Sequence, residues 1–253
     1  MKIALLQSDT VNADIDAAMS HYRQLISHLE PATDLLILPE MFLTGFTTNI
    51  GLAQTGIQGL ELMKDVARKH NTAVCGSLLT EDNGRYYNRN FFVYPDLSVV
   101  HYDKKHLFSL SEEPQVLTAG TTKQTLTYKG WKIRLATCYD LRFGSWTQNT
   151  AHDGVLDYDL LIYVASWADV RLQAWDLLLP SRAIENQAFV AAVNRCGTDS
   201  QGFTYKGHSV VLGFKGEVLA SANDNAEELI YCLLDRDKLL HFRNAFPVWR
   251  DWA

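Results

Sequence analysis

Three strand-like apolar runs of this chain end in residues whose types could catalyse a reaction together. Cys138 follows "KIRLAT", Glu40 follows "LLILP", and the pair Lys104 and Lys105 follows "VVHYD". A cysteine beside an ammonium and a carboxylate suits nucleophilic thiol chemistry, because the cation stabilises a thiolate and the carboxylate takes a proton. The residue types therefore predict a cysteine nucleophile.

Each of these residues also has a purely structural interpretation. A free cysteine is usually a small buried hydrophobe, and a charge at a strand end usually turns the chain back to water. The catalytic interpretation is favoured when the residues are taken together, because strand ends on one edge of a sheet converge. Two alternatives stay open. One is a binding or structural protein, and the other is a zinc hydrolase using His101, His106 and Cys138, although two histidines five positions apart are unusual as chelators.

Composition favours one large α/β domain over residues 1–253, since 47% of the residues are hydrophobic and 21% are charged. The formal net charge is −6 and no basic run occurs, which argues against nucleic acid as a partner. The first apolar run ends at Gln7, too early for a secretory signal or a membrane span.

The four cysteines, Cys75, Cys138, Cys196 and Cys232, lie far apart in apolar surroundings. They form neither a paired CxxC motif for zinc nor a dense disulfide framework. This distribution of cysteines predicts that the protein resides in a reducing cytoplasm.

Apolar runs predict strands, and periodic apolar stripes predict helices between them. Helices are expected over 14–30, 57–69 and 170–187, the last kinked or split by Pro180. The segment 94–98 is expected to be a hairpin turn. Strands are expected at 2–7, 35–39, 73–79, 90–95, 98–102, 132–138, 160–166, 189–194, 209–214 and 229–234. These elements predict sheets packed between helices, and ligands are then expected to bind at the strand ends.

Motifs around the three strand ends resemble those of the nitrilase, or carbon–nitrogen hydrolase, superfamily. "LPEMFLTGF", "YDKKHLF" and "CYDLRF" occur in its order and frames, and 182–197 and 207–220 resemble its later segments. The resemblance implies an α/β fold, a single-domain αββα sandwich. "CYDLRF" is similar to the omega-amidase branch, whereas nitrilases carry Cys-Trp-Glu there.

The resemblance also implies roles for the catalytic residues. Cys138 would be the nucleophile, and Glu40 would be general base and then general acid. The frame Y-x-K-x-H-L-F selects Lys104, and not Lys105, for the oxyanion. A second glutamate belongs seven residues before a glycine, which selects Glu113 and leaves Glu112 as its neighbour.

Substrate-binding roles are expected for four residues. The Tyr139 backbone N–H would face the oxyanion, and Trp167 and Phe46 would belong to the pocket. Arg142 would bind a substrate carboxylate, because its planar fork suits that group. The alternative is that Arg142 pairs with Asp140 and braces the loop after the nucleophile.

The expected activity is that of a thiol amidohydrolase acting on a small dicarboxylic acid monoamide, such as 2-oxoglutaramate or 2-oxosuccinamate. N-carbamoyl amino acid hydrolase, aliphatic amidase and nitrilase activities are the alternatives. The chemistry calls for no metal and no organic cofactor, and the resemblance implies a homodimer. Gly144, where the family commonly has proline, and Pro180 depart from the family pattern.

Overall fold

Two six-stranded sheets form the centre of the molecule in the computed structural model, which describes residues 1–10 and 14–252. The first sheet has the order β16 (Glu228–Leu233), β1 (Lys2–Gln7), β2 (Leu35–Ile37), β3 (Ala73–Asp82), β4 (Arg85–Val93) and β5 (Val99–Asp103). The second has the order β15 (Val218–Ser221), β14 (Val210–Leu212), β11 (Phe189–Asn194), β10 (Leu160–Ala165), β7 (Trp131–Thr137) and β6 (Gln124–Tyr128).

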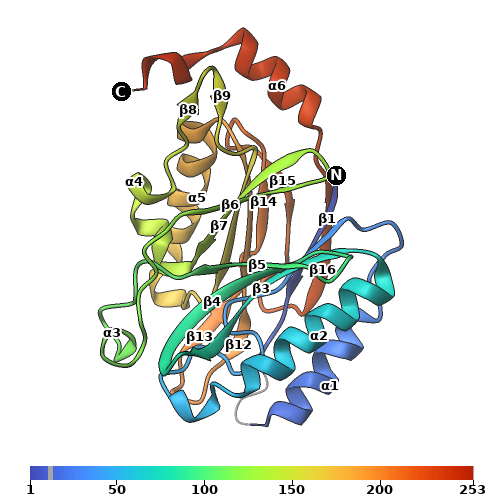
Figure 1. Cartoon of the computed structure of the whole chain (residues 1–253), viewed down its shortest axis with the longest axis vertical. Coiled ribbons are helices and arrows are strands. Elements are labelled where there is room, and N and C mark those ends of the chain that lie inside the picture. The colour runs from blue at the N-terminus through green and yellow to red at the C-terminus, as the bar shows by residue number, and fades with distance from the viewer. Residues whose placement is uncertain (11–13, 253) are drawn as a thin grey trace.

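Three long helices cover the outer faces of the sheets. Figure 1 shows α1 (Ile15–Ile26) and α2 (Thr55–His70) on one side of the paired sheets and α5 (Leu172–Asn186) on the other. Alternation along the strands explains this arrangement, because successive side chains point to opposite faces. In β1, Ala4 and Leu6 pack in the cluster that includes both helices, while Ile3 and Leu5 pack in the cluster between the sheets.

The second sheet repeats the pattern. Leu161 and Tyr163 of β10 pack in the cluster that includes α5, and Ile162 and Val164 join the core between the sheets. The order is therefore helix, sheet, sheet, helix, and the expected αββα sandwich is confirmed.

Shorter elements complete the described part of the chain. They are α3 (Glu113–Val116), α4 (Gly144–Thr147), α6 (Arg236–Ala245), the hairpin of β8 (Ala151–His152) and β9 (Val155–Leu156), the hairpin of β12 (Cys196–Thr198) and β13 (Thr204–Lys206), and 3₁₀ turns at Ile50–Leu52, Cys138–Arg142, Asp169–Arg171 and Val248–Asp251. Among the described helices, none combines the length and the apolarity that crossing a membrane requires.

The expected strands are all present, and the expected turn at 94–98 joins β4 to β5. The helices differ in extent, because α1 ends at Ile26 and α2 begins at Thr55. Of the kink or split expected at Pro180, the split does not occur. The helix continues through this residue, whose missing N–H costs one backbone hydrogen bond, while Trp175, Leu179 and Ala183 pack its inner face into the core.

The strand directions bring four chain segments to one edge of the sandwich. β1, β2 and β3 are parallel, and β5 runs in the direction of β3 because β4 is antiparallel to both. In the second sheet β7, β10 and β11 are parallel. The segments that follow β2, β5, β7 and β10 contain Glu40, Lys104, Cys138 and Ser166, respectively.

Candidate active site

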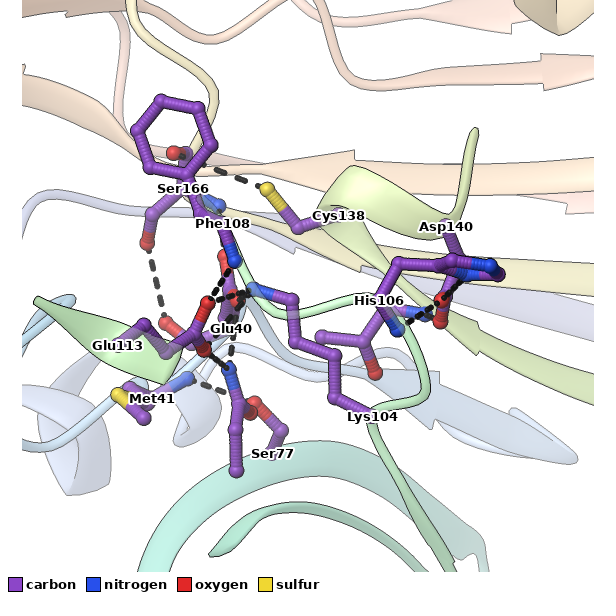
Figure 2. A network of polar contacts seen from close by, with 12 residues as sticks. Glu40, Met41, Ser77, Lys104, His106, Phe108, Glu113, Cys138, Asp140 and Ser166 are labelled. Carbon is purple, nitrogen blue, oxygen red and sulfur yellow. Dashed lines mark hydrogen bonds and ion pairs between the residues drawn. The ribbon is translucent and has the colours of Figure 1, made fainter. Parts of the chain in front are cut away.

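A fully buried ion cluster lies where these segments meet (Figure 2). Lys104 Nζ donates to Glu40 Oε1 at 2.9 Å and to both carboxylate oxygens of Glu113 at 3.0 Å. The exposed fraction of each of the three side chains is 0%. Asn88 Nδ2 donates to Glu40 Oε1 at 2.7 Å and to Glu113 Oε1 at 3.3 Å, so β4 also holds both carboxylates.

Backbone N–H groups fix the outer oxygens of the two carboxylates. Glu40 Oε2 accepts from Ser166 N at 2.8 Å, and the Glu40 carbonyl accepts from Ser166 Oγ at 3.2 Å. These bonds join the end of β2 in one sheet to the end of β10 in the other. Glu113, the first residue of α3, accepts the N–H of Phe108 on Oε2. The cluster therefore ties four chain segments into one rigid unit.

Cys138 stands beside this cluster in an unusual backbone conformation. It begins the 3₁₀ turn after β7 with a φ of 44°, in the left-handed region that residues with side chains rarely adopt. Such a conformation costs on the order of 1–3 kcal/mol and persists only where the surroundings enforce it. Its thiol faces the Ser166 carbonyl at 3.9 Å.

The Asp140 carboxylate enforces the turn that contains the cysteine (Figure 2). It accepts from Thr137 N at 3.0 Å, Tyr102 Oη at 2.7 Å, His106 N at 3.0 Å and contacts His106 Nδ1 at 2.7 Å. His106 and Tyr102 flank Lys104 in sequence, so one buried carboxylate connects the Lys104 segment to the Cys138 segment.

Electrostatics favour an ammonium at Lys104 and a neutral thiol at Cys138. Burial alone would lower the pKa of Lys104, but the carboxylates of Glu113 and Glu40 outweigh it and raise this pKa. Burial and the Glu40 carboxylate raise the pKa of Cys138 well above its usual value, against the opposing pull of Lys104. Lys104 acts in the direction expected from the sequence, since it lowers the pKa of Cys138, but burial and Glu40 outweigh it.

A pocket of about 560 Å³ opens onto the cysteine. Its lining includes Phe46, Lys104, Cys138, Tyr139, Arg142 and Trp167, which were all singled out from the sequence. Glu40 and Glu113 lie behind this wall, and Glu113, not Glu112, contacts Lys104. The guanidinium of Arg142 stacks over the Trp167 ring at 4.9 Å, and within the described residues it forms no ion pair with Asp140.

Sequence reasoning missed several residues of this site. Ser166 ended an expected strand and Asn88 lay just before another, and their contacts with Glu40 depend on pairing between distant segments. Arg171 also lines the pocket, on the 3₁₀ turn before α5. The tip of the β12–β13 hairpin closes one wall through Asp199, Gln201, Phe203 and Tyr205. An arginine after the "SWAD" loop was the available signal for Arg171.

The residues of the zinc alternative are engaged elsewhere. His106 binds Asp140 and stacks on Phe143, with ring centroids 3.9 Å apart, and His101 packs against Phe91. No cluster of three or more possible metal ligands occurs in residues 1–10 and 14–252.

Gly144, the departure from the family pattern, makes room for an arginine. A Cβ at this position would lie 2.8 Å from Arg182 Nη1. The Arg182 guanidinium donates to the Leu141 carbonyl at 2.9 Å and so supports the turn that follows Cys138.

Comparisons with known proteins agree with this geometry. The carbon–nitrogen hydrolase family model matches residues 2–244. The omega-amidase YafV of Yersinia enterocolitica is 35% identical over 99% of this chain and 96% of its own length, and the 2-oxoglutaramate amidase of Bacillus subtilis is 33% identical over 86% of this chain and 84% of its own. The solved structure of a CN-hydrolase superfamily protein from Xanthomonas campestris has a TM-score of 0.94 at 32% identity and covers 100% of this chain and 97% of that one.

Proposed function

Because this chain belongs to the carbon–nitrogen hydrolase family, we propose that it hydrolyses the terminal carboxamide of a small dicarboxylic acid monoamide, such as 2-oxoglutaramate or 2-oxosuccinamate, to the acid and ammonia. One observation carries the proposal. A thiol beside a buried carboxylate and ammonium forms the base of a pocket that also contains arginine side chains. The omega-amidase and 2-oxoglutaramate amidase relatives support this substrate class.

The first step is attack of Cys138 Sγ on the amide carbon. Glu40 takes the thiol proton as the carbon–sulfur bond forms. This transfer leaves the total charge of the buried cluster unchanged, whereas loss of the proton to water would add a buried negative charge. The raised pKa of Cys138 therefore fits a thiol that is activated only when substrate is present.

The second requirement is a site for the oxyanion of the tetrahedral intermediate. Lys104 faces the pocket as an ammonium, and its two carboxylate partners fix its position. The N–H of Tyr139 lies in the first turn after β7, where a helix leaves its N–H groups without intrahelical acceptors. Removing one oxyanion donor typically lowers the rate by about 10²–10³.

Collapse of the intermediate completes the cycle. Glu40 returns its proton to the amide nitrogen, the carbon–nitrogen bond breaks, and ammonia leaves an acyl-thioester on Cys138. A water that Glu40 deprotonates then hydrolyses the thioester and regenerates the thiol. Glu113 positions Lys104, and the protein side chains supply every acid and base that these steps need without a metal or an organic cofactor.

A substrate panel tests the proposal. Initial rates of product release should give a higher kcat/KM for 2-oxoglutaramate and 2-oxosuccinamate than for N-carbamoyl amino acids, aliphatic amides or simple nitriles. If a substrate of one of the other three classes gave the highest kcat/KM, the chain would be assigned to that activity instead.

The assembly and the cellular setting are also proposals. Exposed apolar side chains on α5 (Leu177 and Ile184) and β15 (Val218 and Leu219) support a homodimer. Four free cysteines support a reducing cytoplasm, and the charge of −6 disfavours nucleic acid and acidic membrane surfaces as partners. Light scattering on the purified protein should give twice the monomer mass, and a monomer at micromolar concentration would contradict the dimer.

A further inference from the structure

Two arginines in the pocket stack on aromatic rings instead of pairing with acids. Arg171 lies over the Phe108 ring at 5.0 Å, and Arg142 lies over the Trp167 ring at 4.9 Å. Within residues 1–10 and 14–252, neither guanidinium forms an ion pair. Arg142 is exposed and Arg171 is half-buried, whereas the more deeply buried arginines of the described chain all have a carboxylate partner: Arg89, Arg134, Arg182, Arg195 and Arg243.

The backbone of Arg171 is firmly fixed relative to the reacting end of the site. Its N–H donates to the Ala168 carbonyl at 3.0 Å, and its carbonyl accepts from Trp167 Nε1 at 2.8 Å. The Asn194 amide holds the Trp167 backbone on both sides, at 2.7 and 3.0 Å. Ser166, the residue before Trp167, binds Glu40 and faces the Cys138 thiol. One braced segment thus connects the nucleophile to the Arg171 guanidinium.

We propose that Arg171 is a specificity-determining residue that binds the charged end of the substrate together with Arg142. This inference rests on the proposed monoamide hydrolysis. A cation–π contact with a ring takes up none of the guanidinium N–H groups in an ion pair, so they stay available for an anion. A 2-oxo acid presents a carboxylate and a ketone oxygen side by side, which are acceptors for two such forks.

The acidic residues of the pocket accept hydrogen bonds from neutral groups. Asp199 accepts from Gln201 N, Phe203 N and Tyr205 Oη, and Glu112 accepts from Thr48 Oγ1. Within the described chain neither acid forms an ion pair with Arg142 or Arg171, so the two arginines have no protein counter-ion. They would repel the ammonium of an α-amino acid amide such as glutamine, so the same pair favours the 2-oxo acid over its amino acid counterpart.

The test compares an anionic and a neutral amide of the same chain length. Arg171→Met should lower kcat/KM on 2-oxoglutaramate by about 10- to 100-fold, the usual worth of a hydrogen bond to a charged group, and by less than about threefold on pentanamide. Arg142→Met should show the same selectivity, and Arg171→Lys should lose less than Arg171→Met because it keeps the charge. Arg85→Met, at an exposed site on β4, should leave both rates unchanged.

Calorimetric titration of 2-oxoglutaramate into Cys138→Ala protein, with and without Arg171→Met, gives a readout that needs no turnover. Weaker binding in the double variant supports the proposal. Equal losses on both amides, or no loss on either together with unchanged binding, would overturn it and make Arg171 a loop brace. A wild-type protein that binds the anion through Arg171 but hydrolyses no amide would instead refute the proposed activity.

Discussion

The two ends of strand β10 each carry a buried ionic network, yet the networks differ in what they leave unpaired. Before the strand, Asp159 accepts from Arg243 Nη1 at 2.7 Å and from Arg236 Nε at 2.8 Å. Arg243 uses its remaining donors on the carbonyls of Gln187 and Tyr158. After the strand, Ser166 leads into the cluster of Glu40 and its partners.

The first network is closed, and it fastens α6 to the second sheet. Its donors and acceptors satisfy one another, which is the usual condition for burying charge without a large penalty. The second network stops short of this condition at the pocket. There the Cys138 thiol lies 3.9 Å from the Ser166 carbonyl, and the Lys104 ammonium lines a pocket of about 560 Å³. Buried charge thus stabilises at one end and is available for chemistry at the other.

The largest loss of activity is expected from substitution of Cys138, the proposed nucleophile. Cys138→Ser should lower kcat by at least about 10⁴-fold, since loss of a catalytic nucleophile removes the whole covalent route. Ammonia release measures the effect. In the wild-type protein, intact mass and peptide mapping after treatment with iodoacetamide at pH 9 should locate the adduct at Cys138, because the pocket opens onto this thiol and its lining contains none of Cys75, Cys196 and Cys232. Labelling spread evenly over all four cysteines would contradict the assignment.

The second prediction tests which of two adjacent lysines belongs to the network of Glu40 and its partners. Lys104→Met should lower kcat by about 10²–10³ or more through loss of the oxyanion donor. It should also lower thermal stability, because Glu40 and Glu113 would stay buried without their cation. Lys105→Met is the matched control. Lys105 lies half-buried with its Nζ 5.5 Å from the Trp146 ring, and most of the activity should survive its loss. The reverse ranking would place the catalytic lysine one residue later.

The third prediction concerns the network around Asp159, whose loss should lower stability and leave activity nearly unchanged. Arg243→Met leaves Asp159 with one cation fewer in a buried site, and breaking such a pair typically costs about 3–5 kcal/mol. At about 2–4 °C per kcal/mol for a chain of this class, Tm should fall by roughly 6–20 °C. Below the new transition, kcat/KM should stay within about twofold of the wild-type value. A loss of kcat/KM as large as that of Lys104→Met would mean that the two networks are coupled through β10.

Much of the fold was predictable from local patterns, because buried strands and amphipathic helices carry their own signal. The misses have physical causes. The strand β6 lacks an apolar run, although its hairpin partner β7 was found, and the turn between them is marked by Lys129 and Gly130, both at positive φ. This two-residue turn with glycine was a readable signal. Helix α6 was missed because few apolar residues interrupt its charges.

The site was predictable only where a short motif carries it. Glu40, Lys104 and Cys138 stand in recognisable frames, but the contacts of Ser166 and Arg171 arise from parallel pairing of β7 with β10, which joins Thr137 to Val164 across a long stretch of sequence. The pKa of Cys138 depends on contacts of the same long-range kind. The sequence showed that a lysine was near, and it did not show that burial and Glu40 would outweigh the lysine.

The smallest expected effect measures this protonation state directly. With the pKa of Cys138 well above its usual value, the thiolate fraction below that pKa rises about tenfold per pH unit, so iodoacetamide should label Cys138 faster at each step from pH 7 to 9 without a plateau. Glu40→Gln should change the rate of Cys138 labelling and the rate of turnover in opposite directions. Removing the carboxylate lowers the pKa of Cys138, because the negative charge of Glu40 no longer opposes a thiolate, so labelling at pH 7 should become faster while turnover falls for want of a general base. A plateau near pH 7 in the wild-type protein, or slower labelling in Glu40→Gln, would show a preformed thiolate and a catalytic network as closed as the one around Asp159.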